Sequence, residues 1–335
     1  MGRTAAMIRT LFLCFLLGGC AGVQTPLDPA GLQSAQLLSL FGLMLWVCGV
    51  AYVLVLGFLG WSLWRARRRI AAETAPEVNP VHRGLSRGLW GWTAFVATGL
   101  LLLAIASFLT DWTLARAERR GAIEVSVTGH QWWWRIQYRD PASGQWIETA
   151  NELHLPQDRT TLIRLGAADV IHSFWIPNVA GKMDVIPGRA NQLALTPRRA
   201  GWFRGQCAEF CGPQHAHMAL DVKVESPAEF TAWLAAQAKP AAAGGDPTAL
   251  AVVTAGPCAA CHMIRGTDAK GRVGPDLTHL ASRRSLAAGT LPMSRGAVQG
   301  WVAQPRAIKP GTMMPPVPLS GPQADAVSRY LMALK

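Results

Sequence analysis

Long apolar stretches alternate with mixed segments along the chain and divide it into regions of different structure. Residues 36–64 are apolar and uncharged, and residues 89–110 form a second apolar stretch. Each stretch exceeds the roughly 20 apolar residues that a helix needs to cross a bilayer. An arginine cluster at residues 65–69 ends the first stretch, and the positive-inside rule places this end in the cytoplasm. The pattern predicts a two-helix transmembrane hairpin over residues 36–110, with both chain ends on the outer side.

The next region, residues 111–236, has the short alternating pattern of β-strands. The clearest alternating runs lie at residues 123–127, 161–165, 192–195 and 219–224. Gly, Pro and Asp separate these runs, which predicts an all-β sandwich or barrel. The sequence Ser226-Pro-Ala-Glu229 is a capping box that begins a short helix. Residues 237–247, rich in Ala, Gly and Pro, then predict a flexible linker.

The first 20 residues have the pattern of a secretory signal. Arg3 and Arg9 flank the start of an apolar core at residues 11–17, which is too short to span a bilayer. The run Leu17-Gly-Gly-Cys20 resembles a bacterial lipoprotein cleavage site and predicts that Cys20 is lipidated. Ordinary signal cleavage nearby is the alternative.

Composition and charge favour a membrane protein and argue against a nucleic-acid partner. The chain has 335 residues, a mean hydropathy of +0.18 and only 16% charged residues. Its net charge of +12 is uneven, because residues 111–236 hold thirteen basic and thirteen acidic residues. Residues 246–335 hold ten basic and four acidic ones. A nucleic-acid partner would suit the total charge but not this distribution.

Residues 206–218 concentrate metal-binding side chains. They contain Cys207, Cys211, His215, His217 and Met218 within thirteen residues, and His172 lies upstream. Thiolates, imidazoles and a thioether form a soft ligand set that suits copper. Two thiolates, two imidazoles and a thioether are one ligand too many for a single tetrahedral ion, whereas two metals bridged by the sulfurs would use them all. A structural Cys2His2 zinc site with an incidental methionine is the alternative.

This motif resembles the binuclear copper signature of cytochrome c oxidase subunit 2, whose fold is a cupredoxin-like Greek-key barrel. The resemblance implies that both cysteines bridge two coppers and that each copper takes one histidine. It also implies weak ligation by a methionine and by a backbone carbonyl, and a magnesium ion on the Glu209 carboxylate at the interface with subunit 1. The implied copper ligands are His172, Cys207, Glu209 through its carbonyl, Cys211, His215 and Met218. His217 has no ligand role in this pattern.

A second family motif is Gly129-His-Gln-Trp-Trp-Trp134. Side chains alternate along a strand, so at least one of the three indoles must point away from the core. The resemblance implies that Trp132 sits on the surface above the copper pair and admits electrons from cytochrome c. The alternative is that all three indoles serve only core and interface packing.

Residues 248–335 carry a c-type haem attachment motif, Cys258-Ala-Ala-Cys261-His262. The cysteines would form thioethers to the haem, His262 would bind its iron, and the Pro275 carbonyl would accept a hydrogen bond from His262. The loop Lys309-Pro-Gly-Thr-Met-Met-Pro315 resembles the methionine-ligand loop of small cytochromes c, an all-α family. Its Pro-Gly-Thr-x-Met frame indicates Met314 as the axial ligand, with Met313 and Met293 as the remaining candidates. A thioredoxin-like pair or a zinc site would lack its supporting pattern or a fourth ligand.

The whole chain therefore resembles a bacterial subunit 2 with a fused cytochrome c domain. The resemblance implies electron transfer from haem c through the copper pair to haem a of subunit 1, which reduces oxygen to water and translocates protons. It implies subunits 1 and 3 as partners, with cytochrome c or quinol–cytochrome c reductase as donor. It also implies a multi-pass protein of the bacterial inner membrane, with both cofactor domains on the periplasmic side.

One departure from the family concerns proton entry. The glutamate usually found three residues before Trp92-Thr93 is Leu89 here, and the usual proline after them is Val96. This leaves proton entry, not electron transfer, without its usual residue.

Two rival functions fit the sequence less well. A nitrous-oxide reductase needs a histidine-rich propeller, which eight histidines cannot supply, and a copper-delivery protein would lack the haem motif and the tryptophan run.

Overall fold

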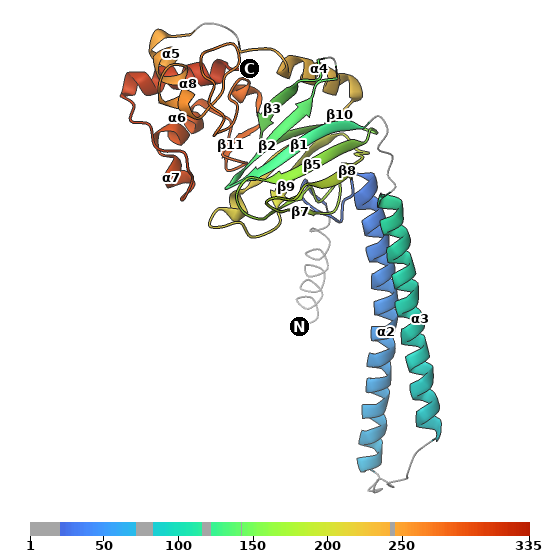
Figure 1. Cartoon of the computed structure of the whole chain (residues 1–335). Coiled ribbons are helices and arrows are strands. Elements are labelled where there is room, and N and C mark those ends of the chain that lie inside the picture. Colours follow the sequence, from blue (N-terminus) through green and yellow to red (C-terminus); the bar gives the residue numbers. More distant parts are fainter. Residues whose placement is uncertain (1–20, 72–82, 116–121, 142, 242–244) are drawn as a thin grey trace, which may run out of the picture. The chain divides into compact units, whose positions relative to one another are not determined.

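The computed structural model describes residues 21–71, 83–115, 122–141, 143–241 and 245–335 (Figure 1). The predicted signal with Cys20 lies outside the described residues. Contacts within the chain define two compact units. One unit is residues 36–117, and the other combines residues 1–35 with residues 118–335. The β-rich region and the haem-motif region thus belong to the same unit.

The first unit is a hairpin of two long helices, α2 (Leu32–Ala71) and α3 (Arg83–Ala115) (Figure 1). Both extend beyond the apolar stretches because helix-compatible polar residues flank them. The segments Leu32–Arg68 and Gly84–Ala115 are long and apolar enough to cross a membrane. Large apolar side chains are exposed along both helices, as lipid contact requires. Gly99 marks a close approach, since a Cβ there would lie 3.3 Å from Cγ1 of Val47 on α2.

The β-rich region of the second unit contains two five-stranded sheets. One sheet has the order β3-β2-β1-β5-β8 and the other the order β4-β10-β9-β6-β7. The strands of the first sheet are β1 (Ile123–His130), β2 (Trp133–Arg139), β3 (Trp146–Ala150), β5 (Thr161–Ala167) and β8 (Asn191–Leu195). The strands of the second are β4 (Glu152–Pro156), β6 (His172–Trp175), β7 (Met183–Val185), β9 (Gly201–Cys207) and β10 (Ala219–Glu225). The expected cupredoxin-like β-domain is confirmed.

Alternation of side chains builds the core of this β-domain. Along β2, Trp134, Ile136 and Tyr138 are fully buried while the residues between them face outward. Strand β1 pairs antiparallel with β2 and parallel with β5, and β10 pairs parallel with β4. The predicted capping box begins α4 (Pro227–Gln237), where the Ser226 side chain accepts from the Glu229 backbone N–H. The alternating runs therefore predicted β1, β5, β8 and β10, and the capping box predicted the helix that follows them.

Residues 21–35 pack against the β-domain, which the sequence pattern did not predict. Buried Asn178 holds this segment, because its Nδ2 donates to the carbonyls of Gly22 at 2.8 Å and Asp28 at 2.9 Å. The Asp28 carboxylate also accepts two hydrogen bonds of 2.8 Å from Arg199. At Gly31 an added Cβ would lie 2.2 Å from the Val179 carbonyl oxygen, so only glycine allows this approach.

The haem-motif region forms a separate hydrophobic cluster of short helices. Its elements are α5 (Pro247–Val253), η2 (Pro257–Ala260), η3 (Leu280–Ser282), β11 (Ser285–Leu286), β12 (Leu291–Pro292), α6 (Arg295–Ala303), α7 (Pro305–Ile308) and α8 (Gly321–Ala333). The predicted all-α domain is confirmed, with one short two-stranded sheet added. Helix α8 packs against α5 and α6 and closes the domain.

The predicted flexible linker is wrong for residues 239–241. The Ala241 N–H donates to the Arg265 carbonyl at 2.9 Å, and the Ala241 side chain is buried in the haem-region cluster. The Lys239 carbonyl accepts a hydrogen bond of 3.0 Å from His279 Nε2. Composition misled here because a small alanine side chain fits a core as well as it fits a linker. Residues 242–244 lie outside the described part of the chain.

Candidate metal and haem sites

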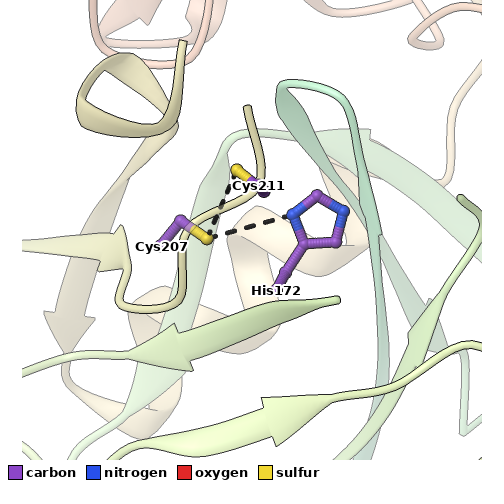
Figure 2. Close-up of side chains that lie close together, drawn as sticks. All are labelled: His172, Cys207 and Cys211. Atoms are coloured by element: carbon purple, nitrogen blue, oxygen red, sulfur yellow. Dashed lines mark hydrogen bonds between the residues drawn. The ribbon is translucent and has the colours of Figure 1, made fainter. Parts of the chain in front are cut away.

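The predicted copper ligands meet at one end of the β-domain. Cys207 ends β9, His172 begins β6, and the other ligands lie on the loop that leads into β10. The two sulfurs lie 3.8 Å apart, and Nδ1 of His172 lies 3.9 Å from Sγ of Cys207 (Figure 2). On the other side, Sγ of Cys211 lies 3.6 Å from Nδ1 of His215 and 3.8 Å from Sδ of Met218.

The donor atoms divide into two sets around the sulfur pair. His172 and the Glu209 carbonyl, 3.2 Å away, lie beside Cys207, while His215 and Met218 lie beside Cys211. The sulfurs are too far apart for a disulfide, whose S–S bond is about 2.05 Å. Each side of the sulfur pair thus has one imidazole and one weak donor. This donor set fits two soft metal ions that share the thiolates better than it fits one tetrahedral zinc ion.

The thiol pair favours an ionised sulfur. The neighbouring Cys211 thiol lowers the pKa of Cys207 to about 3, although burial opposes this shift. The interaction with Cys207, followed by burial, raises the pKa of Cys211. Metal ligands must be deprotonated, so binding of a metal would release the remaining thiol proton.

Asp169 orients one of these ligands, and sequence reasoning missed it. Its Oδ1 lies 2.8 Å from Nε2 of His172, and its Oδ2 accepts from the Gln131 N–H at 2.7 Å. Burial lowers the pKa of His172, but hydrogen bonds to Cys207 and Asp169 outweigh it and raise that pKa. A carboxylate on one ring nitrogen directs the other toward the metal. The only signal in the sequence was an acidic residue three positions before His172.

Trp132 is buried, which corrects the expectation that it lies on the surface. Its exposed fraction is 7%, and its Nε1 donates to the Cys211 carbonyl at 2.9 Å. The haem-motif region covers it, because an added Cβ on Gly311 would lie only 3.1 Å from Cη2 of the indole. The outward-facing indole is Trp133, which stacks on His130. The proposed role of Trp132 in electron entry stays a prediction.

A cavity of about 310 Å³ brings the predicted haem ligands together. Cys258, Cys261, His262 and Met314 all line it. Nδ1 of His262 lies 2.7 Å from the Pro275 carbonyl oxygen, which confirms the predicted hydrogen bond. Burial lowers the pKa of His262, so its imidazole is neutral and available as a ligand at physiological pH.

The cavity suits a haem with acidic side groups. Arg283 lines it, and Nε of this buried guanidinium has no hydrogen-bond partner among the described residues. Burial lowers the pKa of Arg283, which shows how poorly solvated this cation is. An anionic haem propionate would satisfy such a donor. Sequence reasoning did not single out Arg283, because one arginine among many carries no local signal.

The neighbouring methionines differ in their environment. Met313 is 78% exposed, whereas Met314 is half-buried and packs against the haem-region core. This difference favours Met314 over Met313 as the axial ligand.

Two further residues belong to the predicted metal-binding motif. The side chain of Glu209, the predicted magnesium ligand, is exposed. His217 points its Nδ1 toward Gln214 Oε1 at 2.9 Å and does not join the copper ligands.

Comparisons with known proteins identify the families of both domains. Residues 141–225 match the family described as the periplasmic domain of cytochrome c oxidase subunit II, and residues 251–335 match the cytochrome c family. Cytochrome c oxidase subunit 2 of Bacillus sp. strain PS3 is 33% identical over 73% of each chain. The Bacillus subtilis protein of that name is 30% identical over 80% of each chain. The Alkalihalophilus pseudofirmus protein of that name is 29% identical over 99% of this chain and 98% of its own. The chain belongs to the cytochrome c oxidase subunit 2 family and carries a C-terminal cytochrome c domain.

Proposed function

We propose that the chain is the electron-transfer subunit of an aerobic respiratory oxidase. Electrons would pass from its covalent haem c, through a binuclear copper centre, to haem a of subunit 1, where oxygen is reduced to water with proton translocation. The observation that carries this proposal is the position of Trp132. Its ring contacts Gly311 in the cytochrome domain, and its Nε1 donates to the carbonyl of the copper ligand Cys211.

At the copper site, the bound metal pair would supply reversible one-electron chemistry. The thiolates of Cys207 and Cys211 and the imidazoles of His172 and His215 would hold the metal pair. The thioether of Met218 and the carbonyl of Glu209 would be its weaker donors. Asp169 supports this assignment because it fixes the orientation of His172. A rigid, buried ligand set limits structural change when the charge changes.

At the haem site, the cysteines of the attachment motif would bind the porphyrin covalently, and the haem would supply a second one-electron centre. His262 and Met314 would hold the iron, and the Pro275 carbonyl fixes the ring orientation of His262. Arg283 supports the assignment because it offers its unused donor to a propionate. Methionine ligation raises the potential relative to two histidines.

The helix hairpin and the exposed copper loop support the membrane and subunit assignments. The two apolar helices anchor the protein in the bacterial inner membrane, with both cofactor domains on the periplasmic side.

Subunits 1 and 3 are the proposed partners. The exposed carboxylate of Glu209 is free to bind a magnesium ion shared with subunit 1. Cytochrome c or quinol–cytochrome c reductase would supply the electrons. Leu89 means that proton entry does not use the family's usual glutamate.

Metal analysis and rapid reduction of the purified full chain test this function. We expect two coppers for each haem, and electron transfer from the haem to the copper within one molecule after a reducing pulse. One zinc and no copper would overturn the copper assignment. Copper that stays oxidised beside a reduced haem would overturn the electron path.

A further inference from the structure

Lys309 is a buried cation whose hydrogen-bond partners belong to both cofactor domains. Its exposed fraction is 3%, and its Nζ donates to the main-chain carbonyls of Trp132 at 2.8 Å, His217 at 2.9 Å and Ala287 at 3.0 Å. We call these three oxygens the carbonyl cluster. Two of them belong to the copper domain, whereas Ala287 and Lys309 belong to the cytochrome domain.

The carbonyl cluster fits an ammonium ion. Three acceptors at hydrogen-bond distance match the three N–H bonds of a charged lysine, whereas a neutral amine has only two. Burial lowers the pKa of Lys309 to about 7, although the charge interaction with Cys211 opposes this shift. A buried ammonium needs hydrogen-bond acceptors, and the carbonyl cluster supplies three of them. Two of the three acceptors are lost if the domains separate. Lys309 therefore favours the arrangement in which the two domains are in contact.

The position of Lys309 relates this contact to the electron path. It begins the loop that leads to Met314, and Gly311 of this loop packs against the ring of Trp132. Trp132 in turn donates to the carbonyl of Cys211. The Lys309 bond to the Trp132 carbonyl thus holds the methionine loop and the indole together.

Other contacts join the domains at a second place and define the same docked arrangement. The Ala219 N–H on β10 donates to the Ala288 carbonyl at 3.1 Å. The Arg284 N–H donates to Oε2 of Glu152 on β4 at 2.6 Å. Ala219 directly follows the proposed copper ligand Met218, whereas Arg284 and Glu152 are not adjacent in sequence to any proposed metal ligand. The Arg284 amide can therefore report docking apart from the cofactors.

We propose that Lys309 is a positioning residue that holds the Met314 loop against Trp132, so that electron transfer occurs within a docked pair of domains. The proposal rests on the proposed function and names the residue that sets its geometry. The step transfers one electron, with the haem iron oxidised and the copper pair reduced, and no bond is formed or broken at Lys309.

Lys309→Met tests the proposal in the full cofactor-loaded chain, because it keeps the apolar stem and removes every donor. Lys309→Gln retains an amide that can donate to part of the carbonyl cluster. Arg306→Gln on α7 is the matched control, since it removes an exposed cation three residues away. After a pulse that reduces the haem, we expect the haem-to-copper rate to fall about tenfold or more in Lys309→Met. The rate should be intermediate in Lys309→Gln and unchanged in the control.

Hydrogen exchange gives a readout that does not depend on electron transfer. The Arg284 amide, which donates across the domain interface to Glu152, should exchange faster in Lys309→Met than in the wild type, with the haem and copper spectra unchanged. The electron-transfer rate should also become sensitive to solvent viscosity, because docking then limits it.

Equal rates and equal Arg284 exchange in wild type and Lys309→Met would overturn the proposal. Loss of either cofactor spectrum in Lys309→Met would make Lys309→Gln the deciding variant, judged by the same two measurements against the same control. Wild-type protein that shows no haem-to-copper transfer would instead overturn the proposed function, so the two failures are distinguishable.

Discussion

At the residue scale, the proposed copper ligands differ in the number of metal ions that each would bind. The sulfurs of Cys207 and Cys211 lie 3.8 Å apart between the two donor sets, and in the proposed centre each sulfur would serve both sides. Met218 approaches only Cys211. A bridging thiolate holds two ions at once, whereas a thioether is a weak axial donor to one.

Replacing a bridging and an axial ligand should therefore have different effects. Cys211→Ser should abolish the binuclear centre, because a hydroxyl group does not replace a bridging thiolate. Met218→Leu should keep two coppers and shift their potential. Copper content and electron paramagnetic resonance of the purified variants measure both effects. Two coppers with an unchanged spectrum in Cys211→Ser would contradict the bridging role.

The two adjacent methionines allow a second comparison of single residues. Met314→Ala should lose the methionine–iron charge-transfer band of the oxidised haem and lower its potential, because Met314 is the half-buried member of the pair. Met313→Ala is the matched control, because Met313 is exposed. This variant should keep the charge-transfer band. The opposite result would move the ligand by one residue, and a band that survives in both would indicate Met293.

At the element scale, a buried histidine joins two parallel strands of the copper domain. His154 on β4 places Nδ1 2.7 Å from Oε1 of Glu225 on β10 and Nε2 3.1 Å from Oε1 of Glu152. Its ring also stacks on Trp233 of α4. Both ring nitrogens face carboxylate oxygens, so the site favours the charged imidazolium, which donates from both nitrogens.

This arrangement predicts that stability depends on pH. Burial lowers the pKa of His154, but the hydrogen bonds to Glu152 and Glu225 outweigh it and raise that pKa above its ordinary value. The stabilisation is therefore fully present below about pH 6.5, the unfolded value, and is lost as pH rises through the raised folded pKa. Thermal unfolding of the full chain in detergent should show this decline.

His154→Leu leaves two buried carboxylates without their cation. We expect it to destabilise the copper domain by about 3–5 kcal/mol at pH 6 and to remove this part of the pH dependence. His217→Gln, which changes an exposed histidine, is the control. Wild-type stability that rises from pH 6 to pH 9 would refute the assignment of a charged His154.

At the scale of the whole molecule, the cytochrome domain occupies the surface above the copper site. Trp132 is buried because Gly311 and Lys309 lie on it. The copper and cytochrome domains nevertheless have separate hydrophobic cores. We therefore expect the copper domain to keep its fold when the cytochrome domain is removed.

Ending the chain at residue 238 should uncover Trp132. We expect soluble cytochrome c to reduce the copper of the shortened protein directly, whereas in the full chain the copper should be reduced only after the covalent haem. Stopped-flow absorbance at the haem and copper bands distinguishes the two orders. Copper reduction in the full chain that precedes haem reduction would contradict the covering of Trp132.

The sequence by itself determined the cofactor chemistry, because the copper and haem motifs are local. Most copper ligands lie within residues 207–218, and the haem attachment residues lie within five positions, so the spacing of residue types identifies them. Long apolar runs likewise predicted the helix hairpin, and period-two alternation predicted β1, β5, β8 and β10 but not the other strands of the two sheets.

Only the tertiary structure decided how these parts meet. The Asp169 bond to His172, the cavity position of Arg283 and the burial of Trp132 depend on contacts between loops or domains, which no local pattern encodes. The bond from Lys309 to Trp132 joins residues 177 positions apart. The hydrophobic pattern predicts which side chains are buried but not their neighbours, because many packings bury the same residues. The relation between the two redox sites is therefore a property of the folded chain.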